Sequence, residues 1–537
     1  MEVRTFFRIF HSVLLALSCL TFAAAGASAD EYDNYDGAEG HLEDAIGATP
    51  LYDADDEPPT PQSVSLEKST DLSESLVSAG GCDAGCGGCD CCGGKVAKAV
   101  AGSHKGVFYN NNFNYVCDPC YDGWYPGDEL KRLGVGDLIT FDVGGQYRMR
   151  QHNENNFRTR TGGAAGITGA DDSFMLQRTR LFANAQVGRR FRVSAEMIDA
   201  VSIWEDFAPR PIEENRTDVL NLFGDVMLLD GNCGELWGRY GRQELVYGAQ
   251  RVISPLDWAN TRRTFEGGKM FYKGQSWDVD AFWVKPVAPV TNRLDGVNQN
   301  QEWMGLYTTY KDLPIGPVDL YYLRYNGING AFNYNTFGGR YNGSYDDVWL
   351  MDLETDYQYG QVGGVGQLAG AYTVGLGRKF PCVKWTPTFW AYYDWASGDA
   401  NRGTGYHHQF PLAHKYNGFM DLFGRRNLED INFLLTARPH KKVKLLAWWH
   451  IFQLQNSADI PYNVVMGAQE GVTVAGGSPD LGQELDLLAS IAINPRLNLL
   501  FGYSHFFTGD FYRTNTSPGL TYTGDADFFY TQAHVNF

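Results

Sequence analysis

Apolar and polar side chains alternate with period two through most of the chain after residue 136. The clearest case is residues 174–197, which read FMLQRTRLFANAQVGRRFRVSAEM and contain a turn at 187–190. One face carries apolar side chains such as Leu181 and Phe191, and the other carries arginines and amides, with Phe182 as its one apolar exception. Because successive side chains of a strand point to opposite faces, this segment is predicted to be a hairpin of two long strands.

The same alternation recurs at six further places, separated by the Gly, Asn and Asp residues that hairpin turns require. These segments are 141–150, 277–285, 387–395, 442–452, 497–507 and 527–537. The region from 136 to the end, at roughly 20 to 25 residues per strand and connection, gives about 16–18 strands, which lies within the range of outer-membrane barrels.

Periodicity alone does not say which face of each strand is wet. In a soluble β-sandwich the apolar face would point inward, whereas in a membrane barrel it would meet lipid and the polar face would line a hydrated lumen. The start of the chain favours the barrel: Arg4 and Arg8, the run VLLALSCLTFAAA and Ala27-Ser28-Ala29 form a secretory signal, so the mature chain is predicted to begin at Asp30.

Aromatic residues favour the barrel as well. The last amphipathic segment ends on Phe537, which resembles the signal by which outer-membrane barrels are recognised for assembly. Tryptophans near strand ends are expected to form interfacial girdles. They are Trp277, Trp283, Trp390, Trp395, Trp448 and Trp449. We therefore predict an all-β, transmembrane antiparallel barrel with Leu181 against lipid and Arg178 in the lumen.

Charge divides the chain into three zones. The net charge is −19, and residues 30–135 hold 20 acidic against 6 basic side chains. We expect a signal peptide at 1–29, an acidic, Cys-rich and mostly disordered region at 30–135, and an outer-membrane barrel at 136–537. Nucleic acid is excluded as a partner, because no segment combines a basic excess with interleaved aromatics.

Seven cysteines fall between residues 82 and 120. They are Cys82, Cys86, Cys89, Cys91, Cys92, Cys117 and Cys120. Such close spacing can ligate zinc or an iron–sulfur cluster, which makes these residues weak candidates for a metal site. An exported chain meets an oxidising compartment, so disulfides or an intermolecular cross-link are favoured over a metal, and no defined role is the third alternative.

Several long motifs follow one another in the barrel zone. Residues 239–267 read RYGRQELVYGAQRVISPLDWANTRRTFEG, and YYDWASGD (392–399), FPLAHKYNGFMDLFGRRNLED (410–430), GQELDL (482–487) and GYSHFFTGDF (502–511) come after them. The chain resembles the alginate-export outer-membrane porins over roughly 137–537. The resemblance implies a barrel of about 18 strands whose lumen conducts an anionic polysaccharide, with a periplasmic export machinery as a candidate partner. The acidic, Cys-rich zone is not part of the pattern.

A conduit for a uronate polymer needs cations along its path that do not bind too tightly. Arginine suits this role, because its planar fork pairs with carboxylates and stays charged. Strand parity places five arginines on the lumen face, together with Glu196: Arg148, Arg150, Arg178, Arg180 and Arg192. The resemblance adds five more: Arg239, Arg242, Arg251, Arg262 and Arg263.

Two alternatives stay open for these residues. The arginines could instead pair with lumen carboxylates and hold the cross-section of the barrel; the candidate carboxylates are Glu196, Glu244, Asp257 and Glu266. Trp258 and Asn260 could contact sugar faces and hydroxyls, or Trp258 could be an interfacial anchor. His407, His408 and His414 are read as solvent-exposed or sugar-contacting residues of a loop.

The expected function is passive passage of an anionic polysaccharide, an oligosaccharide or related anions across the outer membrane. The chain has no H-E-x-x-H, G-x-S-x-G or Walker-type sequence, so we expect neither an enzyme nor a cofactor. Outer-membrane lipid is an expected partner. The alternatives are a general or nutrient-uptake porin with no polysaccharide role and, in a different class, a secreted β-rich protein that binds or degrades polysaccharide.

Overall fold

The structure is a computed structural model that describes residues 92–159, 164–327, 331–400 and 403–537. The predicted signal peptide and most of the acidic zone lie outside these ranges, so both stay predictions. Within the described ranges, no helix is long and apolar enough to cross a membrane.

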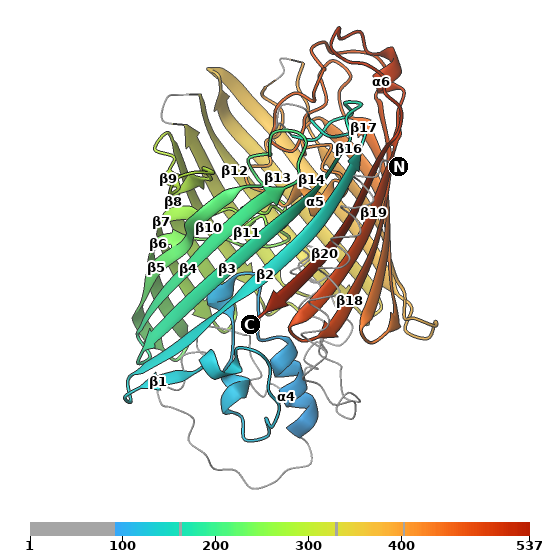
Figure 1. The fold of residues 1–537 in the computed structure, drawn as a ribbon. Coiled ribbons are helices and arrows are strands. Elements are labelled where there is room, and N and C mark those ends of the chain that lie inside the picture. The colour runs from blue at the N-terminus through green and yellow to red at the C-terminus, as the bar shows by residue number, and fades with distance from the viewer. Residues whose placement is uncertain (1–91, 160–163, 328–330, 401–402) are drawn as a thin grey trace.

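Eighteen antiparallel strands form a closed barrel, which confirms the predicted fold class (Figure 1). The barrel strands are β2 (Ile139–Asn155), β3 (Asp172–Val187), β4 (Phe191–Ile203), β5 (Asn215–Gly231), β6 (Gly234–Gln243), β7 (Phe265–Gly274), β8 (Trp277–Ala288), β10 (Gln301–Tyr310), β11 (Val318–Gly327), β12 (Phe332–Tyr345), β13 (Trp349–Val362), β14 (Val365–Lys379), β15 (Thr388–Ala396), β16 (Leu428–His440), β17 (Val443–Leu454), β18 (Asp480–Asn494), β19 (Leu497–Thr508) and β20 (Ala526–Asn536). The barrel closes where β20 pairs with β2, from Gln146 opposite Asn536 to Asn155 opposite Asp527. Two short strands, β1 (Leu133–Val135) and β9 (Gly296–Val297), pair with β2 and β8.

The two faces of the wall have the predicted polarity. Leu181 on β3 and Val193 on β4 are 48% and 51% exposed on the outer surface, whereas Arg178 and Arg192 are 1% and 6% exposed on the lumen side. A closed barrel has no sheet edge, so the backbone polar groups of the wall pair within the sheet apart from local bulges such as that between Met227 and Leu229, as hydrocarbon requires. The apolar stripe is therefore free to meet lipid.

Two of the six tryptophans do not join the predicted girdles. Trp277 and Trp283 are exposed on the outer surface, but Trp390 and Trp448 are buried on the lumen side. Trp390 lies directly over Gly377, its cross-strand neighbour, where an added Cβ would come within 2.5 Å of the indole. Trp448 donates a hydrogen bond to Asn432 Oδ1 at 2.8 Å. The prediction for these two was wrong, because strand alternation puts them on the lumen face, Trp390 with buried Tyr392 and Trp448 with buried His450.

The two ends of the barrel differ. Short turns such as 188–190 and 495–496 lie at the lower end of Figure 1, together with the C-terminus, while the longer connections lie at the upper end. Outer-membrane barrels place short turns on the periplasmic side and long loops outside. The upper connections include α6 (Phe511–Thr514).

Two long connections fold back into the lumen. The first inner segment, residues 244–264, joins β6 to β7 and contacts side chains of β2 and β3. The second inner segment, described at residues 397–400 and 403–427, lies between β15 and β16 and includes α5 (Ala413–Tyr416). Hydrogen bonds join the two segments: Phe410 N–H donates to Val252 O at 3.0 Å, and Leu412 N–H donates to Gln250 O at 2.9 Å.

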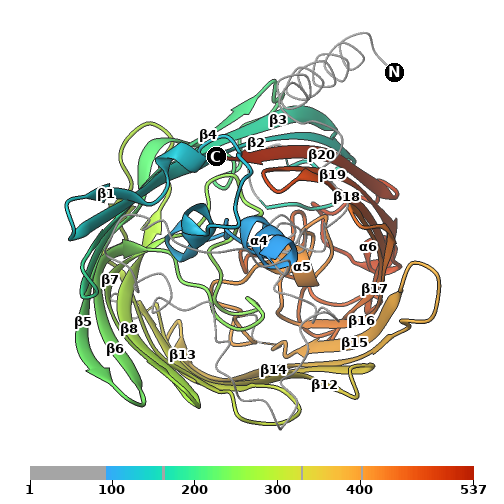
Figure 2. The same ribbon diagram turned by 90° about the horizontal axis from the view of Figure 1, so that it is seen from below.

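The described part of the acidic zone, residues 92–132, is folded; the prediction that residues 30–135 are mostly disordered concerns chiefly residues outside the described ranges and stays a prediction. Residues 92–132 form α4 (Cys92–Ala101) and three short 3-10 helices, η1 (Phe108–Asn110), η2 (Asn114–Cys117) and η3 (Asp128–Leu130), at the short-turn end. Figure 2 shows them inside the ring of strands. Composition missed this because the apolar partners of this segment lie on the barrel wall. Cys117 and Cys120 are disulfide-bonded.

Candidate functional site

The arginines predicted from strand parity gather where β2, β3 and β4 face the first inner segment. Arg148 donates hydrogen bonds to Asp257 O at 2.8 Å and Ala259 O at 3.2 Å, and Arg178 donates to the same two carbonyls at 3.2 Å each. These contacts fix the path of the inner segment across the wall, because charge-assisted hydrogen bonds are about twice as strong as neutral ones.

Arg262 stands at the centre of this contact. It donates through Nε to Glu244 Oε1 at 2.5 Å and through Nη1 to Asp257 Oδ1, and all three side chains belong to the first inner segment. Asp257 also accepts from Arg178 at 2.9 Å. The surrounding guanidinium groups hold the pKa of Asp257 well below its usual range, although burial alone would raise it.

The side chain of Arg251, in the first inner segment, contacts the barrel wall at β13. Its guanidinium donates to Asp352 at 2.7 Å and Glu354 at 2.8 Å, both on β13. The first inner segment therefore connects the arginine-bearing wall at β2–β4 with the acidic wall at β13.

Most of the ten predicted arginines have carboxylate partners. Arg180 pairs with Glu196 at 2.6 Å, Arg192 and Arg239 share Asp225 at 2.5 and 2.7 Å, and Arg242 contacts Asp218 at 3.3 Å and Glu266 at 3.5 Å. The ion pairs are therefore present that the alternative interpretation requires, in which the arginines pair with lumen carboxylates and hold the cross-section of the barrel.

Three of these arginines have no carboxylate within 4.0 Å in the described ranges: Arg148, Arg150 and Arg263. Arg150 donates to Gln532 Oε1 at 2.8 Å and Trp258 O at 2.9 Å, and its Nη2 has no hydrogen-bond partner among the described residues. Arg263 donates to the carbonyls of Ser254 and Pro411. Burial lowers the pKa of Arg263 to about 10.

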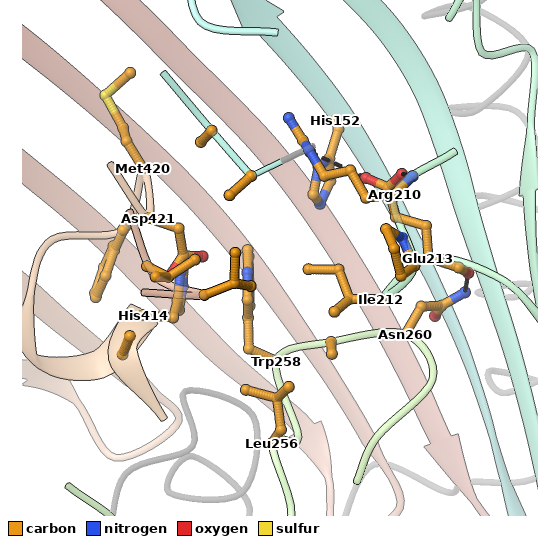
Figure 3. A pocket seen from close by; sticks show the side chains of 18 of the residues that line it. His152, Arg210, Ile212, Glu213, Leu256, Trp258, Asn260, His414, Met420 and Asp421 are labelled. Carbon is orange, nitrogen blue, oxygen red and sulfur yellow. Dashed lines mark hydrogen bonds and ion pairs between the residues drawn. The ribbon is translucent and has the colours of Figure 1, made fainter. Parts of the chain in front are cut away.

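Arg150 and Arg263 line one cavity of about 250 Å³ between β2 and the two inner segments (Figure 3). Its lining is mostly apolar, with Leu256, Ile212 and Met420 among the side chains drawn. Two carboxylates on the same cavity are already neutralised, since Arg210 pairs with Glu154 at 2.5 Å and with Glu213 at 3.0 Å. A third carboxylate of the lining, Asp421, contacts His414 Nδ1 at 3.0 Å. The cavity thus presents two guanidinium groups that form no ion pair within 4.0 Å in the described ranges.

Trp258 and Asn260 position the inner segment and leave no ring face for a sugar. His414 is stacked on the indole of Trp258 with the ring centroids 3.5 Å apart, and Arg150 Cζ lies 3.6 Å from the indole centroid. Two groups this close to the centroid must cover opposite faces, so sugar stacking on Trp258 is ruled out in this conformation. Trp258 is also not an interfacial anchor, because it is buried in the lumen. Asn260 donates to the carbonyls of Gln177 and Glu213.

The three histidines of the second inner segment are not solvent-exposed, which corrects that part of the prediction. His408 and His414 are buried, and His407 is half-buried. Tyr334 OH contacts His407 Nδ1 at 2.6 Å, and Gln409 N–H donates to the same nitrogen at 3.2 Å. The segment folds into the lumen instead of extending into water.

Sequence analysis missed the cluster around Arg210. Glu154 and His152 lie on the same face of β2 as Arg148 and Arg150, so strand parity would have found them. Arg210 and Glu213 fall in the irregular connection between β4 and β5, and no periodic signal marks them.

Comparison with known proteins agrees with this geometry. The family model described as alginate export matches residues 139–524. No curated protein matches the chain. Among solved structures, Acinetobacter baumannii OccAB1 is similar with a TM-score of 0.51 and 10% identity, covering 74% of this chain and 96% of that one.

Two Pseudomonas aeruginosa structures are also similar. OccD3 (OpdP) has a TM-score of 0.48 and 10% identity, covering 74% of this chain and 91% of that one. The outer membrane protein OprD has a TM-score of 0.47 and 10% identity, covering 74% and 94%. At such identities a likeness concerns the fold alone. The family match spans well over half of the sequence, so the chain belongs to the alginate export family and is an outer-membrane β-barrel channel.

Proposed function

We propose that this channel passes anionic oligosaccharide or polysaccharide chains of the alginate type, or related anions, and that it is selective for anions. The observation that carries the proposal is the pair Arg150 and Arg263, which line the lumen cavity without a carboxylate partner among the described residues. An uncompensated buried guanidinium favours an anion from outside the chain, since burying a charge without a partner is costly.

The size and lining of the cavity support a sugar carboxylate as the anion. Ligand pockets commonly measure roughly 300–1,000 Å³, so a cavity of about 250 Å³ suits one sugar unit better than a longer chain. The guanidinium fork pairs with a carboxylate in two-point geometry, and the apolar lining suits the C–H faces of a pyranose. A single weak site of this kind permits exit as well as entry.

One observation favours the alternative of a general or nutrient-uptake porin. Seven of the ten predicted arginines already pair with carboxylates, for example Arg180 with Glu196 and Arg251 with Asp352, which reduces the positive potential along the path. Under this alternative a carboxylated sugar and a neutral sugar of equal size would pass at the same rate. A periplasmic export machinery as a partner stays a prediction.

Uronate oligomers added to a single channel in a planar bilayer should reduce its ionic current at lower concentration than neutral oligomers of the same length. Replacing both Arg150 and Arg263 with glutamine should weaken this block by about tenfold or more, because a hydrogen bond to a charged group contributes about 1.5–3 kcal/mol. Glutamine keeps a hydrogen-bond donor in each place while removing the charge.

The matched control is Arg513→Gln. Arg513 is an exposed arginine that pairs with Asp510 at 3.1 Å on the long-loop side, so its loss should leave the block unchanged. Equal block by uronate and neutral oligomers would support the general porin. Unchanged uronate block in the Arg150 and Arg263 double variant would remove these residues from the selectivity of the channel.

A further inference from the structure

The ordered part of the N-terminal region occupies the short-turn end of the barrel. In Figure 1, α4 lies below the lower ends of the strands, and the view from below in Figure 2 shows it over the opening of the barrel. The connection to β2 runs through β1, whose residues pair with β2 at Leu133–Val135. Residues 92–132 themselves form no strand ladder with the wall, so they can move without breaking the hydrogen bonds that close the barrel.

Aromatic side chains dock this segment on the wall. Phe108 and Phe113 pack against Phe182 of β3, with ring centroids 5.1 and 6.1 Å apart, and Tyr109 packs against Phe223 of β5 at 5.0 Å. This contact explains the one apolar residue on the polar face of the hairpin 174–197. Phe182 faces the lumen because its partner there is protein and not water.

The same segment covers arginines of the lumen wall. Arg180 Cζ lies 3.7 Å from the ring centroid of Phe108, and Arg180 donates a hydrogen bond to Gly106 O at 3.1 Å. Arg192 donates to Tyr109 O at 2.8 Å, and Arg239 Cζ lies 4.4 Å from the ring centroid of Tyr109. Three guanidinium groups that would otherwise face water at this mouth are thus capped by backbone carbonyls and aromatic rings.

Polar groups of the wall hold the segment as well. On β2, Val143 O accepts from Lys131 Nζ at 2.6 Å and Asp142 accepts from Arg132 N–H at 2.7 Å. Arg496, in the turn between β18 and β19, is almost fully buried and donates to Ser103 Oγ at 2.8 Å. It also contacts Asp128 at 3.3 Å and donates to the hydroxyl of Tyr115. With a further hydrogen bond to Val100 O at 3.4 Å, these contacts join α4, η2 and η3 to the turn between β18 and β19, so polar contacts add to the aromatic anchors.

We propose that residues 92–132 are a plug that closes the periplasmic mouth of the channel and opens by leaving the lumen as a unit. The barrel wall is held by continuous backbone ladders, whereas the plug is held by aromatic packing, ion pairs and hydrogen bonds of side chains, for example Tyr109 OH to Glu244 O at 2.6 Å. Elements with few contacts open at lower free-energy cost than the core they sit on. Opening exposes Arg180, Arg192 and Arg239 to the lumen together with their carboxylate partners Glu196 and Asp225.

The plug proposal requires only that the barrel conducts ions, and it does not depend on which solute the channel passes. Its test uses the full chain, with KCl as the only salt. In planar bilayers the wild-type channel should be mostly closed. Arg496→Ala should shift the ratio of open to closed time by about tenfold toward open, because it removes several hydrogen bonds that hold the plug. A second variant, Phe108→Ala with Tyr109→Ala, removes the aromatic anchor and should act in the same direction.

Arg189→Ala is the matched control. Arg189 lies in the turn between β3 and β4 at the same end of the barrel, and its ion pairs go to Asp230 and Glu235 and not to the plug. Heat-modifiable gel mobility reports whether each variant has folded. Folded Arg496 and Phe108/Tyr109 variants with the wild-type ratio of open to closed time would overturn the proposal, as would an equal increase in Arg189→Ala. Uronate block plays no part in either result, so the plug and the proposed selectivity can fail separately.

Discussion

Replacing Arg262 with methionine should lower the free energy of unfolding by about 3 kcal/mol. The substitution keeps much of the side-chain length but leaves Glu244 and Asp257 without their shared guanidinium, and breaking a buried ion pair costs about 3–5 kcal/mol. The lower end of that range applies because Asp257 keeps Arg178 at 2.9 Å and Glu244 keeps Asn221 at 2.9 Å. Urea unfolding of the protein in lipid vesicles measures the change.

An exposed ion pair gives the control for this prediction. Arg216 pairs with Asp199 at 3.2 Å, and their side chains are 50% and 32% exposed. Exposed pairs contribute about 0–1 kcal/mol, so Arg216→Met should have little effect. If both methionine variants lost the same small amount, Arg262 would not be the residue that fixes the first inner segment.

The barrel wall was predictable because its pattern is periodic. Strand parity placed Leu181 outward and Arg178 inward, and the structure agrees. The inner segments have no such period. Arg262 itself has a φ of 60°, as do Gln250 at 61° and Leu256 at 56°, which is the left-handed region that favours glycine. The residue types Arg, Gln and Leu do not predict a left-handed backbone, because it is the contacts with the wall that impose it.

The plug shows the other limit of sequence analysis. Residues 92–132 carry four acidic and five basic side chains, but they belong to the zone 30–135, whose overall composition is acidic and rich in small residues, which is typical of a chain that cannot bury a core. Residues 92–132 become ordered by packing Phe108 and Phe113 on Phe182, whose position on a polar face was visible in the sequence. Phe182, an apolar residue on a polar face, was the one available signal. It did not predict which segment would pack on it or at which end of the barrel that segment would dock.

Acid should destabilise the protein through the second inner segment, and His407 is the residue that we expect to carry much of this effect. Gln409 N–H donates to His407 Nδ1 at 3.2 Å, so that nitrogen must be unprotonated in the folded protein. Burial, with a smaller effect of Arg426, lowers the pKa of His407 to about 3. His408 follows the same rule, since Arg425 N–H donates to its Nδ1 at 3.3 Å and burial lowers its pKa well below the usual value.

The unfolded chain takes up a proton at each histidine near pH 6.5, whereas folded His407 does so only near pH 3. Between these values the unfolded state binds more protons, so the stabilising contribution of neutral His407 is present above pH 6.5 and is lost as the pH falls toward 3. At pH 5 the loss is about 2 kcal/mol for this histidine, from 1.36 kcal/mol per pH unit over about 1.5 units. Urea unfolding at pH 7 and pH 5 measures it. His407→Gln should reduce the difference between the two pH values, while the same change at exposed His440 should leave it intact. An undiminished difference in His407→Gln would show that His407 accepts a proton in the folded lumen, and that the second inner segment is not held by a neutral imidazole.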